Sequence, residues 1–98
     1  MTRFVLTRRA ERDLDQLKNY LAGKASPMIA RRVMKDIRSA LHLLGSQPGA
    51  GHVREDLTSQ SVKFWPVYSY LIVYDPETKP VKIIRVLHGM RDIEEILN

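Results

Sequence analysis

The stretch Val81-Lys82-Ile83-Ile84-Arg85-Val86-Leu87-His88 decides the fold of this 98-residue chain. It is apolar on both faces, and strands of this kind lie in the interior of a sheet. The alternating run from Val62 to Tyr74 is interpreted as a second strand, interrupted at Pro66, which cannot donate to a ladder. Residues 75–80 join the two runs as a turn. The sequence therefore predicts a β-hairpin around which the rest of the chain packs.

Two helices are predicted before this hairpin. The first begins at the capping residue Thr7 and ends at Gly23. The second begins at Ser26-Pro27, a cap followed by a proline in the first turn, and ends at Gly45. In both, apolar residues recur every three or four positions. Because the link between them is so short, we expect an antiparallel helical hairpin.

Shorter elements complete the predicted fold. Residues 2–6 form a strand, residues 53–57 a weak strand, and the tail after His88 a short helix. The predicted class is α+β, with an N-terminal strand, an antiparallel helical hairpin packed on a mostly antiparallel sheet, and a short C-terminal helix. The loop of residues 45–51 is too short for a linker, so residues 1–98 are expected to form a single domain.

The composition excludes several classes of function. The chain has no cysteine, which rules out disulfides, thiolate metal sites and a cysteine nucleophile. Its three histidines are not at ligand spacing and it carries no nucleotide-binding or hydrolase signature, so no metal and no cofactor are expected. We expect a cytoplasmic protein with no membrane partner, because neither a signal peptide nor a long apolar span is present.

The net charge of +5 indicates an acidic partner. Residues 1–51 carry 10 Lys and Arg against 4 Asp and Glu, so the basic charge lies in the helical half. One basic row on the second helix is either a phosphate-binding surface or, as is commoner, a solvated helix face. Aromatic residues of the hairpin are candidates for partner contact, base stacking or core. The candidates are Arg31, Arg32, Lys35, Arg38, Trp65, Tyr68 and Tyr70.

Arg85, His88 and Arg91 are the candidate catalytic residues of the hairpin. A charge inside an apolar strand must be paired or face a cleft, so Arg85 either binds phosphate or forms a buried ion pair, with Asp56 or Glu55. His88 is a candidate acid or base. Alternatively, His88 and Arg91 stabilise the turn that leads into the C-terminal tail. Strand alternation places Arg85 with Ile83, on the face opposite to His88. We therefore expect Arg85 and His88 not to share a site unless the strand twists or breaks before Gly89.

The whole chain resembles the RelE/ParE superfamily of toxins from type II toxin–antitoxin pairs, on the ParE side. The segment around Arg85 is the most diagnostic, and the order and spacing of all segments carry the resemblance. The segments are Leu6-Thr7-Arg8-Arg9-Ala10-Glu11-Arg12-Asp13-Leu14, Pro48-x-x-Gly51, Arg54-x-Asp56-Leu57, Val67-x-x-Tyr70-Leu71-Ile72-Val73-Tyr74 and Ile84-Arg85-Val86-Leu87-His88-Gly89-x-Arg91-Asp92.

The resemblance implies a ParD-like antitoxin as partner and one of two targets. ParE-like toxins inhibit DNA gyrase and so DNA replication, whereas RelE-like relatives cleave mRNA on the ribosome. Cleavage requires a base, an acid and phosphate-binding cations, and the RelE-like enzymes resemble one another in a Lys/Arg cluster on the sheet and a Tyr or His near the C-terminus. Here residues 93–98 contain neither Tyr nor His and add two negative charges. We therefore expect a gyrase inhibitor. The alternatives are a ribosome-dependent mRNA endonuclease that uses Arg85, His88 and Arg91, and a non-toxic partner-binding member.

Overall fold

The computed structural model describes residues 3–89 and 96–97. A four-stranded sheet has the order β1-β4-β3-β2, in which β1 is parallel to β4 and the other pairs are antiparallel. The elements are β1 (Phe4–Leu6), α1 (Arg8–Lys24), α2 (Pro27–Ser46), a 3-10 turn η1 (Pro48–Ala50), β2 (Lys63–Val67), β3 (Tyr70–Asp75) and β4 (Val81–His88). The predicted α+β class is confirmed.

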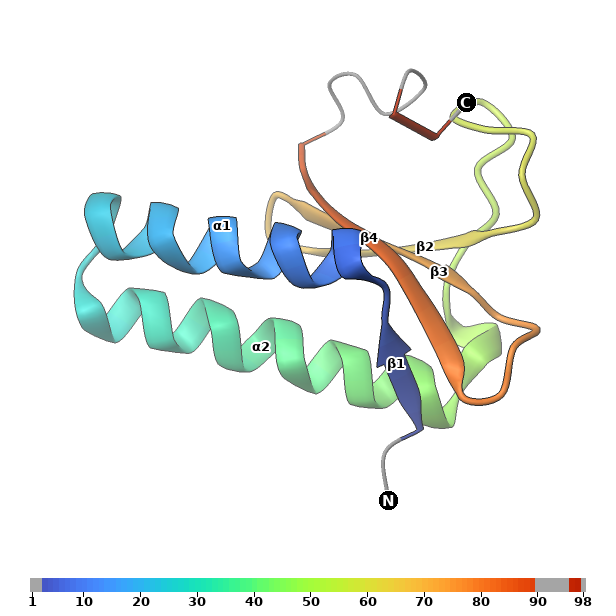
Figure 1. The fold of residues 1–98 in the computed structure, drawn as a ribbon, viewed down its shortest axis with the longest axis horizontal. Coiled ribbons are helices and arrows are strands. Elements are labelled where there is room, and N and C mark those ends of the chain that lie inside the picture. The colour runs from blue at the N-terminus through green and yellow to red at the C-terminus, as the bar shows by residue number, and fades with distance from the viewer. Residues whose placement is uncertain (1–2, 90–95, 98) are drawn as a thin grey trace.

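The two helices form the predicted antiparallel hairpin (Figure 1), and their tip extends past the strands. The Oγ1 of Thr7 caps α1 by accepting from the Ala10 N–H at 3.1 Å. The Oγ of Ser26 caps α2 by accepting from the Ile29 N–H at 3.2 Å. Both helix starts predicted from the sequence are therefore confirmed. No helix of the described residues is both long and apolar enough to span a membrane.

Both faces of the inner strands β3 and β4 are buried. The helices cover one face, where Ile37 and Leu44 of α2 pack near Ile72 and Ile83. The other face packs against the loop before β2 and the end of the chain, through the residues Leu57, Val62, Phe64, Leu71, Val73, Leu87 and Leu97. This two-sided burial explains why five of residues 81–88 are aliphatic. Most of the predicted C-terminal helix lies outside the described residues.

The structure corrects two strand predictions. The run from Val62 to Tyr74 is two strands, β2 and β3, joined by a turn in which Tyr68 has a positive φ of 55°. A positive φ usually calls for Gly or Asn, so the sequence carried no signal for this turn. Residues 53–57 form no strand, because the Leu57 N–H donates to the Arg54 carbonyl at 3.0 Å and closes a local turn.

A buried tyrosine fixes the loop between the helices and the sheet. The Tyr74 hydroxyl accepts a hydrogen bond from the Gly51 N–H at 2.8 Å and donates one to the Pro48 carbonyl at 2.7 Å. A Cβ at Gly51 would lie 2.4 Å from the Tyr74 hydroxyl, closer than van der Waals contact allows. The Pro48-x-x-Gly51 segment therefore has a physical role, since only glycine leaves room for this ring.

Candidate functional site

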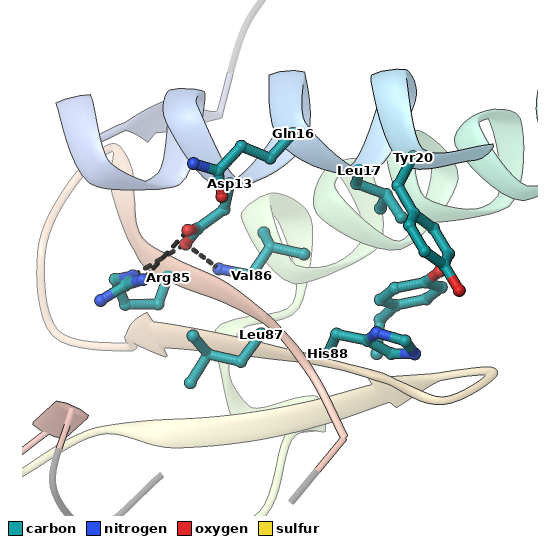
Figure 2. A pocket seen from close by; sticks show the side chains of 9 residues that line it. Asp13, Gln16, Leu17, Tyr20, Arg85, Val86, Leu87 and His88 are labelled. Atoms are coloured by element: carbon teal, nitrogen blue, oxygen red, sulfur yellow. Dashed lines mark hydrogen bonds and ion pairs between the residues drawn. The ribbon is translucent and has the colours of Figure 1, made fainter. Parts of the chain in front are cut away.

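A groove of about 310 Å³ lies between α1 and the last residues of β4. Four side chains of α1 line one wall, at spacings of three or four residues that place them on one side of a helix. Residues 85–88 of β4, together with Tyr70, form the other wall. The α1 residues are Asp13, Gln16, Leu17 and Tyr20. Figure 2 shows Asp13 above Arg85 and Val86, and Tyr20 reaching toward His88.

The ion pair between Asp13 and Arg85 closes one end of this α1–β4 groove. The Asp13 carboxylate accepts from the Arg85 Nε at 2.8 Å and from its Nη2 at 3.0 Å. The side chains are only 10% and 16% exposed. The bond to Asp13 raises the pKa of Arg85, against the opposing effect of burial. The guanidinium is therefore a permanently charged group held by a bidentate partner.

Asp13 also replaces a missing strand at the edge of β4. β1 pairs with β4 only as far as Ile83, and beyond it the Thr7 hydroxyl donates to the Ile84 carbonyl at 2.8 Å. The Val86 N–H then donates to the Asp13 carboxylate at 2.9 Å. Polar side chains thus continue the backbone pairing past the end of β1. Asp13 has this structural role in addition to binding Arg85.

The ion-pair interpretation of Arg85 is correct, but the predicted partners are wrong. Asp56 binds Arg54 instead, at 2.8 Å. Asp13 was missed because it lies 72 residues away in sequence. A signal was nevertheless present, since Asp13 falls on the apolar side of α1, three residues after the buried Ala10 and four before the buried Leu17. A carboxylate at such a position requires a buried partner.

Arg85 and His88 line the same groove, contrary to expectation. The strand pairs Arg85 with Val73, on the face away from the helices, and His88 with Tyr70, on the helical face. A register shift between Val73 and Tyr74 leaves Ile84 as an extra residue, so Ile83 no longer shares a face with Arg85. The open edge of β4 lets the Arg85 side chain reach round to Asp13. Alternation alone did not predict this.

Three aromatic rings form the other end of the groove. The His88 ring stacks on Tyr70, with centroids 4.7 Å apart, and lies 5.9 Å from the Tyr20 ring. Tyr70 is buried, which raises its pKa, whereas Tyr20 is 50% exposed. Sequence reasoning did not identify Tyr20, although it follows Leu17 at helical spacing. This end of the groove offers an apolar surface with hydroxyl and imidazole groups at its rim.

The remaining candidate residues lie elsewhere. Trp65 on β2 is half-buried and stacks on His52, with centroids 6.3 Å apart. Tyr68 lies in the β2–β3 turn, and its hydroxyl donates to the Asp36 carboxylate of α2. Arg31, Arg32, Lys35 and Arg38 are all exposed on α2. Arg91 lies outside the described residues.

The groove is equipped for binding side chains. Its polar groups are the carboxylate and guanidinium of one ion pair, one imidazole, two phenols and an amide, set around Leu17, Val86 and Leu87. A partly apolar recess with a few polar groups at its rim suits an apolar or aromatic anchor from another molecule. Across residues 3–89 and 96–97, no cluster of three potential metal-ligating His, Cys, Asp or Glu side chains occurs.

Fold and groove together define a small α+β protein with a recess between its first helix and its last strand. The family model of the ParE toxin of the type II toxin–antitoxin system parDE matches residues 4–93. The chain therefore belongs to the ParE toxin family.

A solved structure supports the fold. The structure described as the chromosomal ParDE TA system from P. aeruginosa contains a chain similar to this one, with a TM-score of 0.73 and 19% sequence identity. The similarity covers 88% of this chain and 94% of the other. No curated protein matches the chain.

Proposed function

We propose that this chain is the toxin of a type II toxin–antitoxin pair, that it inhibits DNA gyrase, and that a ParD-like antitoxin neutralises it. The observation that carries the choice of target is the state of Arg85. Cleavage of RNA requires cations that are free to bind the scissile phosphate. Both the Nε and the Nη2 of Arg85 are instead held by Asp13, at 2.8 and 3.0 Å.

The experiment is a supercoiling assay with purified gyrase, relaxed plasmid and the full-length toxin. Inhibition that rises with toxin concentration, and that is relieved by the antitoxin, is the expected result. Full supercoiling at large molar excess of folded toxin would remove the gyrase assignment.

A second candidate function is ribosome-dependent mRNA cleavage, because Arg85 and His88 line one groove after all. On this proposal His88 acts as the acid or base, and Arg85 contacts the phosphate through the N–H donors that Asp13 leaves free. The test is to replace His88 by Ala and follow mRNA in a translation reaction. Cleavage by the parent chain and its loss in the variant would support this candidate, whereas intact mRNA with both would eliminate it.

We further infer that the antitoxin contacts the α1–β4 groove. Tyr20 and His88 are exposed there beside buried apolar residues, and Tyr, with a large ring and a polar tip, is a favourable interface residue. Tyr68, 60% exposed in the β2–β3 turn, provides a matched comparison. If the inference is correct, Tyr20→Ala weakens antitoxin binding at least about tenfold and Tyr68→Ala does not. A larger loss of antitoxin affinity for Tyr68→Ala than for Tyr20→Ala would place the contact on the β2–β3 turn.

A further inference from the structure

The exposed face of α2 carries one sign of charge. Its exposed ionisable groups between residues 31 and 38 are Arg31, Arg32, Lys35 and Arg38. We name these four residues the α2 basic strip. None of the four takes part in the salt bridges of the described residues, which are Arg54–Asp56 and Arg85–Asp13. The strip therefore presents four charges that no carboxylate of the described part of the chain neutralises by direct pairing.

The single acidic residue of α2, Asp36, lies one helical turn after Arg32 and is hydrogen-bonded rather than ion-paired. Asp36 is half-buried, and its carboxylate accepts a hydrogen bond from the hydroxyl of Tyr68 in the β2–β3 turn. This contact engages the carboxylate with the β2–β3 turn, and among the described residues no ion pair joins it to Arg32. A solvated helix face normally mixes both signs of charge, as the exposed Glu11, Arg12 and Asp15 of α1 do. The α2 basic strip differs from that pattern.

The spacing of the strip fits a nucleic-acid backbone. Residues 31, 35 and 38 lie along one side of the helix and span about 10 Å at about 1.5 Å per residue. Phosphates of one DNA strand repeat at about 3.4 Å along the duplex axis. A strip of about 10 Å is therefore long enough to reach more than one phosphate of a duplex. Arg32 is next to this row and widens the positive surface.

The strip is more highly charged than the core of a typical protein interface. The cores of protein interfaces are poor in charge and rich in aromatic residues and Met. The exposed Met28 and Ile29 lie one turn before Arg31 and Arg32, but no exposed large apolar side chain lies among or after the four charges, between Arg31 and His42. Four charges with apolar side chains at one end only favour a phosphate backbone over an acidic polypeptide as the occupant.

We propose that the α2 basic strip binds the phosphate backbone of duplex DNA. The proposal rests on the proposed function, because a gyrase–DNA complex would present both a protein and a duplex to the toxin. The strip lies on α2, whereas the groove lies between α1 and β4. One toxin chain therefore has separate surfaces for DNA and for the antitoxin.

The test measures binding of the full-length toxin to a fluorescent duplex of about two helical turns, by anisotropy at several salt concentrations. Four phosphate contacts predict a slope of about −3.6 for log K against log salt, and on the order of a hundredfold loss between about 50 and 200 mM. The double variant Arg32→Glu, Lys35→Glu is expected to reduce the slope by about 2 and to bind at least about tenfold more weakly at low salt. Absence of binding by the parent chain overturns the proposal.

The matched control is Lys79→Glu, Lys82→Glu, which makes the same change in net charge at two exposed positions outside α2. Circular dichroism establishes that both double variants are folded. Retention of parent-like affinity by the control supports the strip, whereas equal losses in both variants would mean attraction to net charge and overturn the proposal. Displacement of the duplex by polyglutamate at equal charge would assign the strip to an acidic protein and also overturn it.

The supercoiling assay separates this proposal from the proposed function. If the parent chain inhibits gyrase but does not bind DNA, the proposed role of the strip is wrong and the gyrase assignment is retained. DNA binding through the strip without any effect on gyrase would support the strip and count against the gyrase assignment.

Discussion

Asp13 of α1 binds Arg85 of β4 through two hydrogen bonds, of 2.8 and 3.0 Å, across 72 residues of sequence. The same carboxylate accepts the Val86 N–H at 2.9 Å, so one side chain neutralises a guanidinium and completes the edge of β4. The pair joins α1 to β4, the strand that packs against the helices on one face and against the second apolar cluster on the other. It also removes two donors of Arg85 from any role in binding phosphate.

Removal of Asp13 should destabilise the protein strongly. Asp13→Ala leaves a mostly buried guanidinium and the Val86 N–H without a partner, and we expect a loss of about 3 kcal/mol or more in the free energy of unfolding. Urea denaturation measures this loss. Arg85→Ala should cost a similar amount, and the double variant should cost clearly less than the sum, with a coupling of about 2 kcal/mol. Additive losses would show that the pair contributes no energy of its own.

Gly51→Ala should destabilise the chain far more than Gly49→Ala. The added methyl group at position 51 would meet the Tyr74 hydroxyl at 2.4 Å and the Phe64 carbonyl at 2.9 Å, whereas nothing lies within 4 Å at position 49. Overpacking of this kind costs about 1 to 3 kcal/mol. Thermal unfolding of the two variants provides the measurement. Equal melting temperatures would contradict the described position of the Tyr74 ring.

The stability should fall at alkaline pH because of Tyr74. Burial raises the folded-state pKa of Tyr74 above its ordinary value of 10.0, and the Gly51 hydrogen bond opposes this only in part. Above about pH 10 the unfolded chain therefore loses this proton more readily than the folded one, and stability decreases as pH rises. Tyr74→Phe should flatten the pH dependence of the unfolding free energy in this range. An unchanged slope in the variant would contradict the assignment.

Thr7→Ala should cost more stability than Ser26→Ala, although each residue caps a helix. The Thr7 hydroxyl accepts from Ala10 and also donates to the Ile84 carbonyl at 2.8 Å, so it joins α1 to β4. The Ser26 hydroxyl makes only the exposed cap bond among the hydrogen bonds described. We expect about 2 kcal/mol for Thr7→Ala and about 1 kcal/mol or less for Ser26→Ala. Denaturant midpoints compare the two, and a larger loss for Ser26→Ala would be the contrary result.

Local chemistry made much of the fold predictable from the sequence. Thr7 and Ser26-Pro27 act through neighbouring backbone groups, so their caps can be read without tertiary structure. The apolar character of residues 81–88 likewise reports burial on both faces. The turn at Tyr68 was not predictable, because no Gly or Asn marks its positive φ. The Tyr68 hydroxyl of this turn instead donates a hydrogen bond to Asp36 of α2, a contact that depends on the tertiary structure.

The site was less predictable than the fold. The requirement that Arg85 be paired follows from its place in an apolar strand, but the identity of its partner depends on how α1 lies on the sheet. The meeting of Arg85 and His88 depends on the short length of β1, which leaves the edge of β4 open beyond Ile83. Neither fact can be predicted from the periodicity of apolar residues along the chain. The groove is therefore a property of the packing.

The measurement that tests the central claim most directly is detection of gyrase–DNA cleavage complexes. Toxin, gyrase, ATP and supercoiled plasmid are incubated, and the enzyme is trapped with detergent before protease treatment and electrophoresis. We predict linear DNA that increases with toxin, requires gyrase, and disappears when the antitoxin is added first. An absence of linear DNA at large toxin excess, with the same preparation cleaving mRNA in a translation reaction, would contradict the account.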